Sequence, residues 1–548
     1  MAGPGPFGRL RAMHQGPDLQ TAGEEIEADR TTDQAEADHA DGTFLPELRH
    51  HRCHPFLPAS YDSAMLEARA HQQLKHLLQQ EGHRRWPHHF TLSRLVARSL
   101  RRQDHTLIRL APGSDPGWLI SLLVPLALAE SSLALICSDA LRQRLLQVEW
   151  PRLTAAGLNP PCWQGATAPP PGTVWLLSPS ELVQVWRSGL LGERQLVVPE
   201  AEMAELLLRE AAAVVIEPSH WDDLRRGQPL ASGSLLDLHE RLSRRILGQP
   251  SGAGRMVAIR DEDEMPLRDL LRLLGPLPDP WQRWLDCGGS AWTSWAVVDP
   301  ALLQWQLHRR PLEPFDALAD LLRGRGVILA GTLPQGSARG TVQQPRGGGF
   351  QPVVTVSLAD PQLADPLPLF APLRQPLPNS PLYSQHLLEQ SRRLVLGQAG
   401  LTVVLVDDPA LQRGLASGLA AEFGSRVTLA TTAPEANGVI VCDWTWWLEQ
   451  QQRLPQPCQI VVALLPIASL EDPLTAARVQ QLRLQGRDWF RELLLPEALG
   501  RLERGVAGLR QGSGRLAVLD GRLRHRSWGR QVLAALEPWC ELSRLLPP

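Results

Sequence analysis

The chain has 548 residues, of which 43% are hydrophobic and 21% are charged, and its formal net charge at pH 7 is -3. This length predicts two to four domains, and the composition is typical of a soluble globular protein. The charge excludes a global basic field that would recruit nucleic acid, and no apolar run is long enough to suggest a membrane span.

Residues 1–45 are expected to form a disordered acidic tail. They begin with Gly and Pro and continue with the acidic stretch GEEIEADRTTDQAEADHADG, which offers few side chains that a core would bury. No apolar stretch of a secretory signal is present at the start. Residues 46–104 are expected to be an N-terminal helical segment. Its His-rich beginning, RHHRCH at 49–54, is interpreted as solvated rather than as a metal site.

From residue 105 to 334 the sequence alternates between short apolar runs and amphipathic helical patterns. Such alternation predicts a parallel sheet with helices on both faces. The strands are expected at 106–111, 132–138, 173–178, 212–218 and 325–334. The stretch at about 225–320 is mostly helical in pattern and is expected to be a helical insert.

A Pro/Gly-rich zone at 335–385 is interpreted as a connection between domains, because Pro and Gly interrupt helices and strands. The alternation restarts in residues 386–548. Strands are expected at 401–408, 426–431, 438–444, 459–466 and 515–520. The sequence therefore predicts an α/β fold with two parallel-sheet domains in tandem.

LAPGSDPGWLISLLVPLAL, residues 110–128, looks like a phosphate-binding loop running into a helix, with Gly113, Ser114 and Gly117 in the loop. Such a loop requires Gly-Lys-Ser or Gly-Lys-Thr, but here Trp118 and Leu119 follow the glycine. The only lysine of the chain is Lys75, in an amphipathic helical pattern without a glycine loop. Arginine does not replace lysine between the phosphates, so no complete loop of this type exists in the chain.

Six segments, in order and with consistent spacing, resemble the XPD/DinG helicases of superfamily 2. They are the lead-in WQLHRRPLEPFDALADLLRGRG, GRGVILAGTLP, LTVVLVDDPALQRGLASGLAAEFG, QIVVALLPIASLEDP, DWFRELLLPEALGRLERG and RLAVLDGRLRHRSWGRQVL. The resemblance implies two RecA-like domains with a nucleotide cleft between them, and ATP and Mg²⁺ as cofactors. It also implies DNA, including single-stranded DNA, as a partner.

This family's chemistry requires a lysine and a hydroxyl on the phosphates and Mg²⁺, an Asp-Glu pair, and an arginine from the second domain. The resemblance aligns the family's Asp-Glu-Ala-His box with residues 217–220, of which Glu217 and His220 are remnants. Pro218 stands at the position of the general base and has no basic group. Hydrolysis through these residues is not expected.

Two placements of the arginine motif remain open. Residues 511–515 read Gln-Gly-Ser-Gly-Arg, which would make Arg515 the arginine finger. The spacing favours residues 504–508 instead, where Gly508 replaces that arginine.

The resemblance further assigns Thr332, Trp444 and Arg522 as candidates for coupling or nucleic-acid contact. Only two cysteines lie between residues 118 and 217, so the four-cysteine iron–sulfur cluster of some relatives is not expected. The seven cysteines are widely scattered, which favours reduced thiols and a cytoplasmic location.

The favoured hypothesis is a pseudo-helicase that has lost ATP hydrolysis and binds nucleic acid or a protein partner. ATP and Mg²⁺ are implied by the family, but the residues at the loop do not support them. One alternative is an active ATP-dependent DNA helicase with a divergent nucleotide site. A second is a scaffold that binds protein through its acidic tail and helical insert.

Overall fold

The computed structural model describes residues 64–82, 86–249, 255–333, 350–360, 363 and 365–542. All of them belong to one compact unit that spans residues 59–548. The predicted acidic tail and the RHHRCH segment lie outside the described residues. Among the described helices, none combines the length and the apolar character that crossing a bilayer requires.

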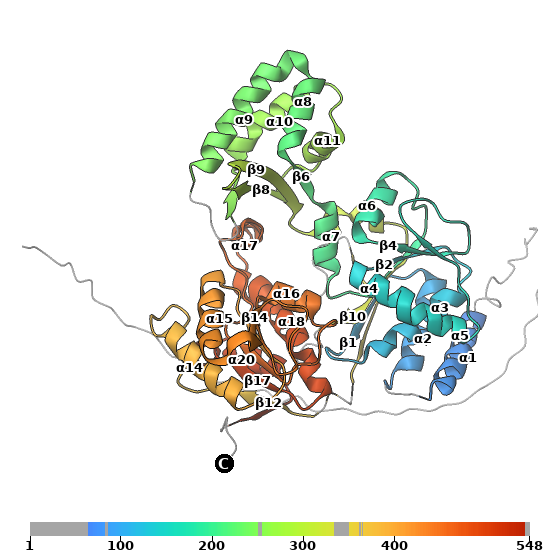
Figure 1. Cartoon of the computed structure of the whole chain (residues 1–548). Coiled ribbons are helices and arrows are strands. Elements are labelled where there is room, and N and C mark those ends of the chain that lie inside the picture. The colour runs from blue at the N-terminus through green and yellow to red at the C-terminus, as the bar shows by residue number, and fades with distance from the viewer. Residues whose placement is uncertain are drawn as a thin grey trace, which may run out of the picture. The chain divides into compact units, whose positions relative to one another are not determined.

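The first parallel sheet has seven strands in the order β11-β1-β10-β5-β2-β4-β3. Figure 1 labels β1, β10, β2 and β4 of this sheet. They are β1 (Thr106–Leu110), β2 (Leu133–Ile136), β3 (Cys162–Gln164), β4 (Val174–Leu177), β5 (Gln195–Val198), β10 (Val327–Thr332) and β11 (Val354–Leu358). The strands predicted at 106–111, 132–138, 173–178 and 325–334 are confirmed, whereas β3, β5 and β11 are too short or too polar to stand out in the sequence.

Helices cover both faces of this sheet, as the continuous apolar strands predicted. One face packs under α1 (Ala64–Gln80), α2 (His89–Arg102), α3 (Leu119–Leu128), α4 (Asp139–Arg144) and α5 (Trp150–Ala155). The other packs under α6 (Pro179–Arg187), α7 (Ala204–Ala212), α12 (Pro314–Ala317) and α13 (Ala319–Leu322). Neighbouring strand residues alternate between the two cores: Ile108 packs in the first and Leu107 in the second.

A small antiparallel sheet, β6-β9-β8-β7, is inserted between β5 and β10. Its elements are β6 (Val214–Ile216), α8 (Pro218–Gly227), α9 (Ser232–Leu247), β7 (Met256–Ala258), α10 (Asp261–Leu273), α11 (Asp279–Asp286), β8 (Trp292–Asp299) and β9 (Gln304–Pro311). Four buried tryptophans fill its core, namely Trp221, Trp281, Trp284 and Trp305.

This insert corrects two predictions. The strand expected at 212–218 does not join the parallel sheet, because β6 pairs antiparallel with β9. The insert is also not only helical, since β7, β8 and β9 lie in it. A three-residue apolar run such as Val214–Ile216 fits either kind of sheet, and only its distant partner strand decides between them.

The second parallel sheet also has seven strands, in the order β14-β15-β13-β16-β17-β12-β18. They are β12 (Leu367–Phe370), β13 (Thr402–Leu405), β14 (Val427–Leu429), β15 (Val439–Cys442), β16 (Gln459–Val462), β17 (Arg515–Val518) and β18 (Trp539–Glu541). Its helices are α14 (Tyr383–Leu396), α15 (Pro409–Phe423), α16 (Trp444–Gln450), α17 (Pro473–Leu484), α18 (Leu495–Val506), α19 (Arg522–His525) and α20 (Gly529–Ala535). All five strands predicted for this domain are confirmed.

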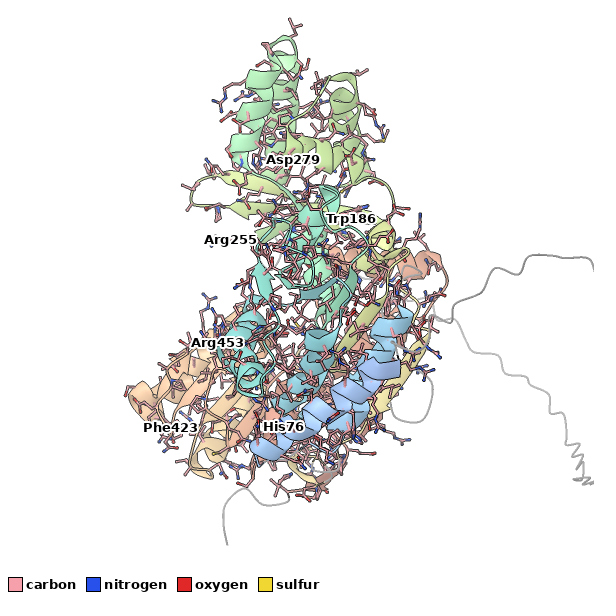
Figure 2. All side chains as sticks on the ribbon, turned by 90° about the vertical axis from the view of Figure 1, so that its right-hand side faces the viewer. His76, Trp186, Arg255, Asp279, Phe423 and Arg453 are labelled. Carbon is pink, nitrogen blue, oxygen red and sulfur yellow. The ribbon has the colours of Figure 1, made fainter. Side chains whose placement is uncertain are left out.

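Two tandem parallel-sheet domains of the RecA-like kind are therefore present, as predicted from the alternating pattern. Figure 2 locates two of their outlying parts: Asp279 begins α11 of the insert, and Phe423 ends α15 of the second domain. The zone 335–385 is not only a connection. It supplies β11 to the first sheet and β12 to the second, so the second parallel domain begins at Leu367.

Candidate functional site

The loop that resembles a phosphate-binding loop follows β1 at the carboxyl end of the first sheet. Gly113 has a φ of +94°, in the left-handed region that favours glycine. The backbone amide of Ser114 donates to the carbonyl of Ala111 at 3.0 Å. The amide of Gly117 donates to Oδ1 of Asp115 at 2.7 Å. The Asp115 carboxylate therefore accepts a hydrogen bond from a backbone amide that, in a phosphate-binding loop, would donate to phosphate.

Trp118 turns away from the mouth of this loop. Its side chain is 6% exposed and packs in the core beneath α1, α2 and α3. Leu119, at the position of the Mg²⁺-binding hydroxyl, is buried in the same core. Ser114 is 5% exposed, and its hydroxyl has no hydrogen-bond partner among the described residues. Trp118 and Leu119 stand where a phosphate-binding lysine and a Mg²⁺-binding hydroxyl are expected, and both are part of the hydrophobic core.

Two carboxylate side chains, Glu200 and Glu202, follow the carboxyl end of β5. β5 pairs with β10 and β2, so Glu200 and Glu202 emerge at the same sheet edge as the loop after β1. Glu200 accepts hydrogen bonds from the backbone amide and the hydroxyl of Ser138 at 2.7 and 2.8 Å. Burial raises the pKa of the Glu200 carboxyl above its usual range.

Glu202 is joined to the end of β10. Its carboxylate accepts from the backbone amide of Thr332 at 3.0 Å and from the Thr332 hydroxyl at 3.1 Å. Gly331 makes this approach possible, because a Cβ there would overlap Oε2 of Glu202 and lie 2.6 Å from the amide of Ala201. Burial raises the pKa of Glu202, although Arg504 and the Thr332 hydrogen bonds act in the opposite direction.

Sequence reasoning missed Glu200 and Glu202. The topology puts Pro199-Glu200-Ala201-Glu202, after the strand QLVV, at the carboxyl edge of the parallel sheet, where the Asp-Glu-Ala-His box was expected. The sequence signal was present but short: three apolar residues, Leu196 to Val198, followed by Pro199 and two carboxylates. The apolar run before Glu217 was chosen instead because it resembles a buried strand equally well.

Glu217 and His220 lie in the insert, not at the edge of the parallel sheet. They cap the start of α8 reciprocally: the Glu217 side chain accepts from the backbone of His220, and the Glu217 amide donates to Nδ1 of His220 at 3.0 Å. Because β6 belongs to the antiparallel sheet, Glu217 and His220 do not lie at the carboxyl edge of the parallel sheet, where they were expected. Their arrangement is that of an N-terminal helix cap.

The second parallel domain contributes the segment 504–511, the end of α18 and the short η8 (Ala507–Gln511), to the loop after β1. Nε2 of Gln511 donates to the carbonyl of Gly113 at 2.8 Å. The carbonyl of Ala507 comes so close that it would lie 3.0 Å from a Cβ on Gly113. Nη1 of Arg504 donates to Sδ of Met203 at 2.8 Å. Direct contacts thus join the two halves where a cleft was expected.

Of the two placements of the arginine motif, the structure brings 504–508 to the loop. Gly508 lies in η8, next to Ala507. Arg515 begins β17, at the amino end of the second sheet, and donates to Oε1 of Gln459 at 2.5 Å and to the carbonyl of Leu394 at 2.9 Å. Arg515 therefore takes part in the packing of its own domain.

Trp444 and Arg522 also have partners within the second domain. Trp444 is fully buried, and its indole Nε1 donates to the carbonyl of Leu464 at 3.0 Å. The Arg522 guanidinium forms an ion pair with Asp520 at 2.6 Å. Trp444 thus acts as core, and Arg522 holds a turn after β17.

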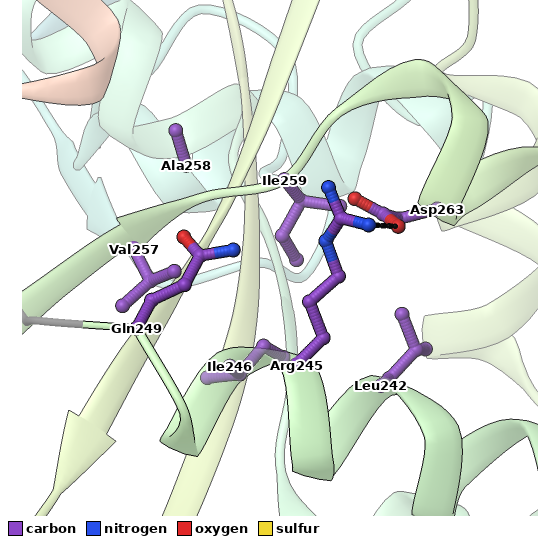
Figure 3. A pocket seen from close by; sticks show the side chains of 8 residues that line it. All are labelled: Leu242, Arg245, Ile246, Gln249, Val257, Ala258, Ile259 and Asp263. Atoms are coloured by element: carbon purple, nitrogen blue, oxygen red, sulfur yellow. Dashed lines mark ion pairs between the residues drawn. The ribbon is translucent and has the colours of Figure 1, made fainter.

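A small depression in the insert lies between α9, β7 and α10 (Figure 3). It is lined by Leu242, Arg245, Ile246, Gln249, Val257, Ala258, Ile259 and Asp263. An ion pair between Nη1 of Arg245 and Oδ1 of Asp263, at 2.8 Å, crosses it. Within the described residues, no group of three His, Cys, Asp or Glu side chains is placed to hold a metal ion.

Comparison with known proteins gives two curated relatives. The chain is 28% identical over 176 residues to the ATP-dependent DNA helicase YoaA of Escherichia coli, covering 30% of this chain and 28% of that protein. It is 30% identical over 105 residues to YoaA of Haemophilus influenzae, covering 19% of this chain and 16% of that protein. The matches thus span less than a third of each relative's length. No family model matches the chain.

Solved structures match over most of the chain. The S. tokodaii Xpd4 structure has a TM-score of 0.54 at 10% identity, covering 81% of this chain and 97% of that one. An apo XPD structure has a TM-score of 0.53 at 12% identity, covering 82% of this chain and all of that one. The chain therefore shares the fold of the XPD structures, and part of it is similar in sequence to YoaA.

Proposed function

We propose that this XPD/DinG-like chain has lost ATP hydrolysis and acts as a nucleic-acid-binding pseudo-helicase. One observation carries the proposal: Trp118, at the position of the phosphate-binding lysine, is a core residue, while Asp115 holds the amide of Gly117. Phosphoryl transfer depends almost entirely on placed charge. A buried indole and an added carboxylate both work against a bound triphosphate.

Mg²⁺ with ATP does not fit the surrounding residues either. Leu119 offers no hydroxyl, and Pro199 offers no carboxylate at the first position of the box. Glu200 retains an acidic group, but its carboxylate is engaged by Ser138. At the arginine motif, Gly508 has no side chain to stabilise a developing charge. No hydrolytic step is therefore assigned to this chain.

Nucleic acid is the favoured partner because both curated relatives are named DNA helicases, and because binding to phosphates needs basic surface rather than an intact nucleotide site. The cysteines are widely scattered, and the six that lie in the described residues form no disulfide, which supports a cytoplasmic setting. A protein-binding scaffold is the competing role, and co-purification of partners with the full chain and with a chain lacking residues 1–45 would test it.

The first experiment measures ATP binding and hydrolysis by the full chain with Mg²⁺, with and without single-stranded DNA. We expect neither binding nor turnover. Turnover that rises with DNA and disappears in Glu200→Gln would overturn the proposal and favour an active helicase with a rebuilt site. Glu217→Gln is the matched control, because Glu217 caps a helix in the insert and lies outside the sheet edge.

A further inference from the structure

α1 and α2 form a helical hairpin whose outer surface is strongly basic. Together the two helices carry six Lys or Arg side chains and one carboxylate, Glu67, in a chain whose net charge is -3. Cross-helix contacts fix their antiparallel arrangement: Arg101 bonds to Glu67 at 2.8 Å, and Nη2 of Arg94 lies 3.4 Å from Nδ1 of His71. The charge is thus concentrated on one element rather than spread over the chain.

Four of these cations, Lys75, Arg94, Arg98 and Arg102, are called the basic hairpin face. All four are exposed, and none forms an ion pair with a carboxylate of the described residues. Arg94, Arg98 and Arg102 recur every fourth position, which puts them in one row along α2. Lys75 stands one turn after His71 on α1, the histidine that contacts Arg94.

Packing holds this face toward solvent. The opposite sides of the two helices are buried in the first core through Leu74, Leu77, Leu92, Val96 and Leu100. Among the described residues of α1 and α2, no large apolar side chain is exposed, so the face offers nothing to an apolar partner or to a lipid core. Figure 2 shows α1, with His76 labelled, along the surface of the molecule.

The ring of His71 supports the same grouping. Burial, and then the positive charges of Arg94 and Lys75, lower the pKa of His71 below its usual value. The two cations therefore act on one histidine from both helices, and that histidine stays neutral between them at pH 7.

We propose that the basic hairpin face binds the phosphate backbone of nucleic acid. The inference rests on the proposed function and adds a specific site to it. Exposed arginines in a row that pair with no carboxylate of the described residues match a line of phosphates, because each guanidinium can donate two parallel hydrogen bonds to a phosphate. Unlike the residues of the nucleotide loop, these side chains remain free to reach a ligand in solution.

Lys75 provides a direct test, because it is the only lysine in the chain. Amine acylation of the full chain, followed by mass spectrometry of the peptide with Lys75, measures access to this single side chain. We expect a thymidine oligonucleotide to slow acylation several-fold at low salt and to lose this effect at high salt. Unchanged acylation under conditions where the oligonucleotide is bound would overturn the proposal.

A second test replaces the whole face by Lys75→Gln, Arg94→Gln, Arg98→Gln and Arg102→Gln, and follows fluorescence anisotropy of a labelled single strand against salt. Each single-strand phosphate contact contributes about 0.7 to the slope of log affinity against log salt, so we expect the slope to fall by about 3. The matched control removes four exposed arginines elsewhere, Arg226, Arg244, Arg272 and Arg323, and so changes the net charge equally.

The outcomes separate the two proposals. If the natural chain binds the oligonucleotide and both quadruple variants bind equally well, the basic hairpin face is not the site, while nucleic-acid binding stands. If the natural chain binds no nucleic acid, the nucleic-acid part of the proposed function fails as well. Equal protection of Lys75 by poly-glutamate would assign the face to acidic proteins instead.

Discussion

Glu202 and Thr332 join the ends of two neighbouring strands of the first sheet through two hydrogen bonds of 3.0 and 3.1 Å. Both acceptor atoms belong to one half-buried carboxylate, and both donors belong to one residue. Arg504, from the second domain, acts on the same carboxylate as a nearby positive charge. The carboxyl edge of the first sheet is therefore connected by contacts within the protein, at the place where a nucleotide site was expected.

Replacing Thr332 by Val should cost stability. The substitution removes the hydroxyl donor to Glu202 and leaves a half-buried carboxylate oxygen without that partner, at a cost of about 1–3 kcal/mol. Thr332→Ser keeps the hydroxyl and should cost about 1 kcal/mol or less. Urea unfolding of the two variants measures the difference. If Val and Ser variants unfold at the same urea concentration, the hydroxyl bond does not contribute.

Trp118→Lys should destabilise the protein without creating an ATP site. A lysine ammonium would enter the core where the indole is now packed, so we expect a loss of at least about 3 kcal/mol. ATP binding should remain undetectable, since Asp115 still bonds to the amide of Gly117. Thermal unfolding and ATP titration check both parts.

Trp163→Lys is the control for that substitution, because Trp163 is 36% exposed and lies on the short edge strand β3. It should lose about 1 kcal/mol or less. A Trp118→Lys protein that is as stable as the control, or that binds ATP tightly, would contradict the assignment of Trp118 to the core.

Gly113→Ala should weaken the contact between the loop and the second domain. A Cβ at φ +94° is strained by about 1–2 kcal/mol, and here it would also press on the carbonyl of Ala507. Gly289→Ala is the matched control, since Gly289 has φ +91° and open space around the same position. Hydrogen exchange in residues 507–511 should increase in the first variant only. Equal exchange in both would mean that the loop and η8 are not in stable contact.

Glu503 should make stability fall with rising pH. Burial raises the pKa of this carboxyl from 4.5 to about 7, and Arg510 opposes the rise. The folded state then binds a proton more tightly than the unfolded state, so the stability gained from the protonated form is present below pH 4.5 and is lost as pH rises to about 7. Glu503→Gln should flatten this part of the profile and stabilise the protein above pH 7 by roughly 1–3 kcal/mol. Urea unfolding from pH 4 to pH 8 measures it, and an unchanged slope would refute the assignment.

The sequence by itself determined the two alternating domains, because long apolar runs between amphipathic helices have few ways to be buried other than a parallel sheet covered on both faces. It also determined that no lysine stands in the loop after β1, since that depends on residue identity alone. Only the tertiary structure decided which strand carries the candidate box. LVV before Glu200 and VVI before Glu217 are equally apolar, and the choice between them depends on the pairing of their strands with β10 and β9. The contact of Gln511 with Gly113 was likewise beyond sequence reasoning, because it joins residues of two domains whose approach depends on packing rather than on any local pattern.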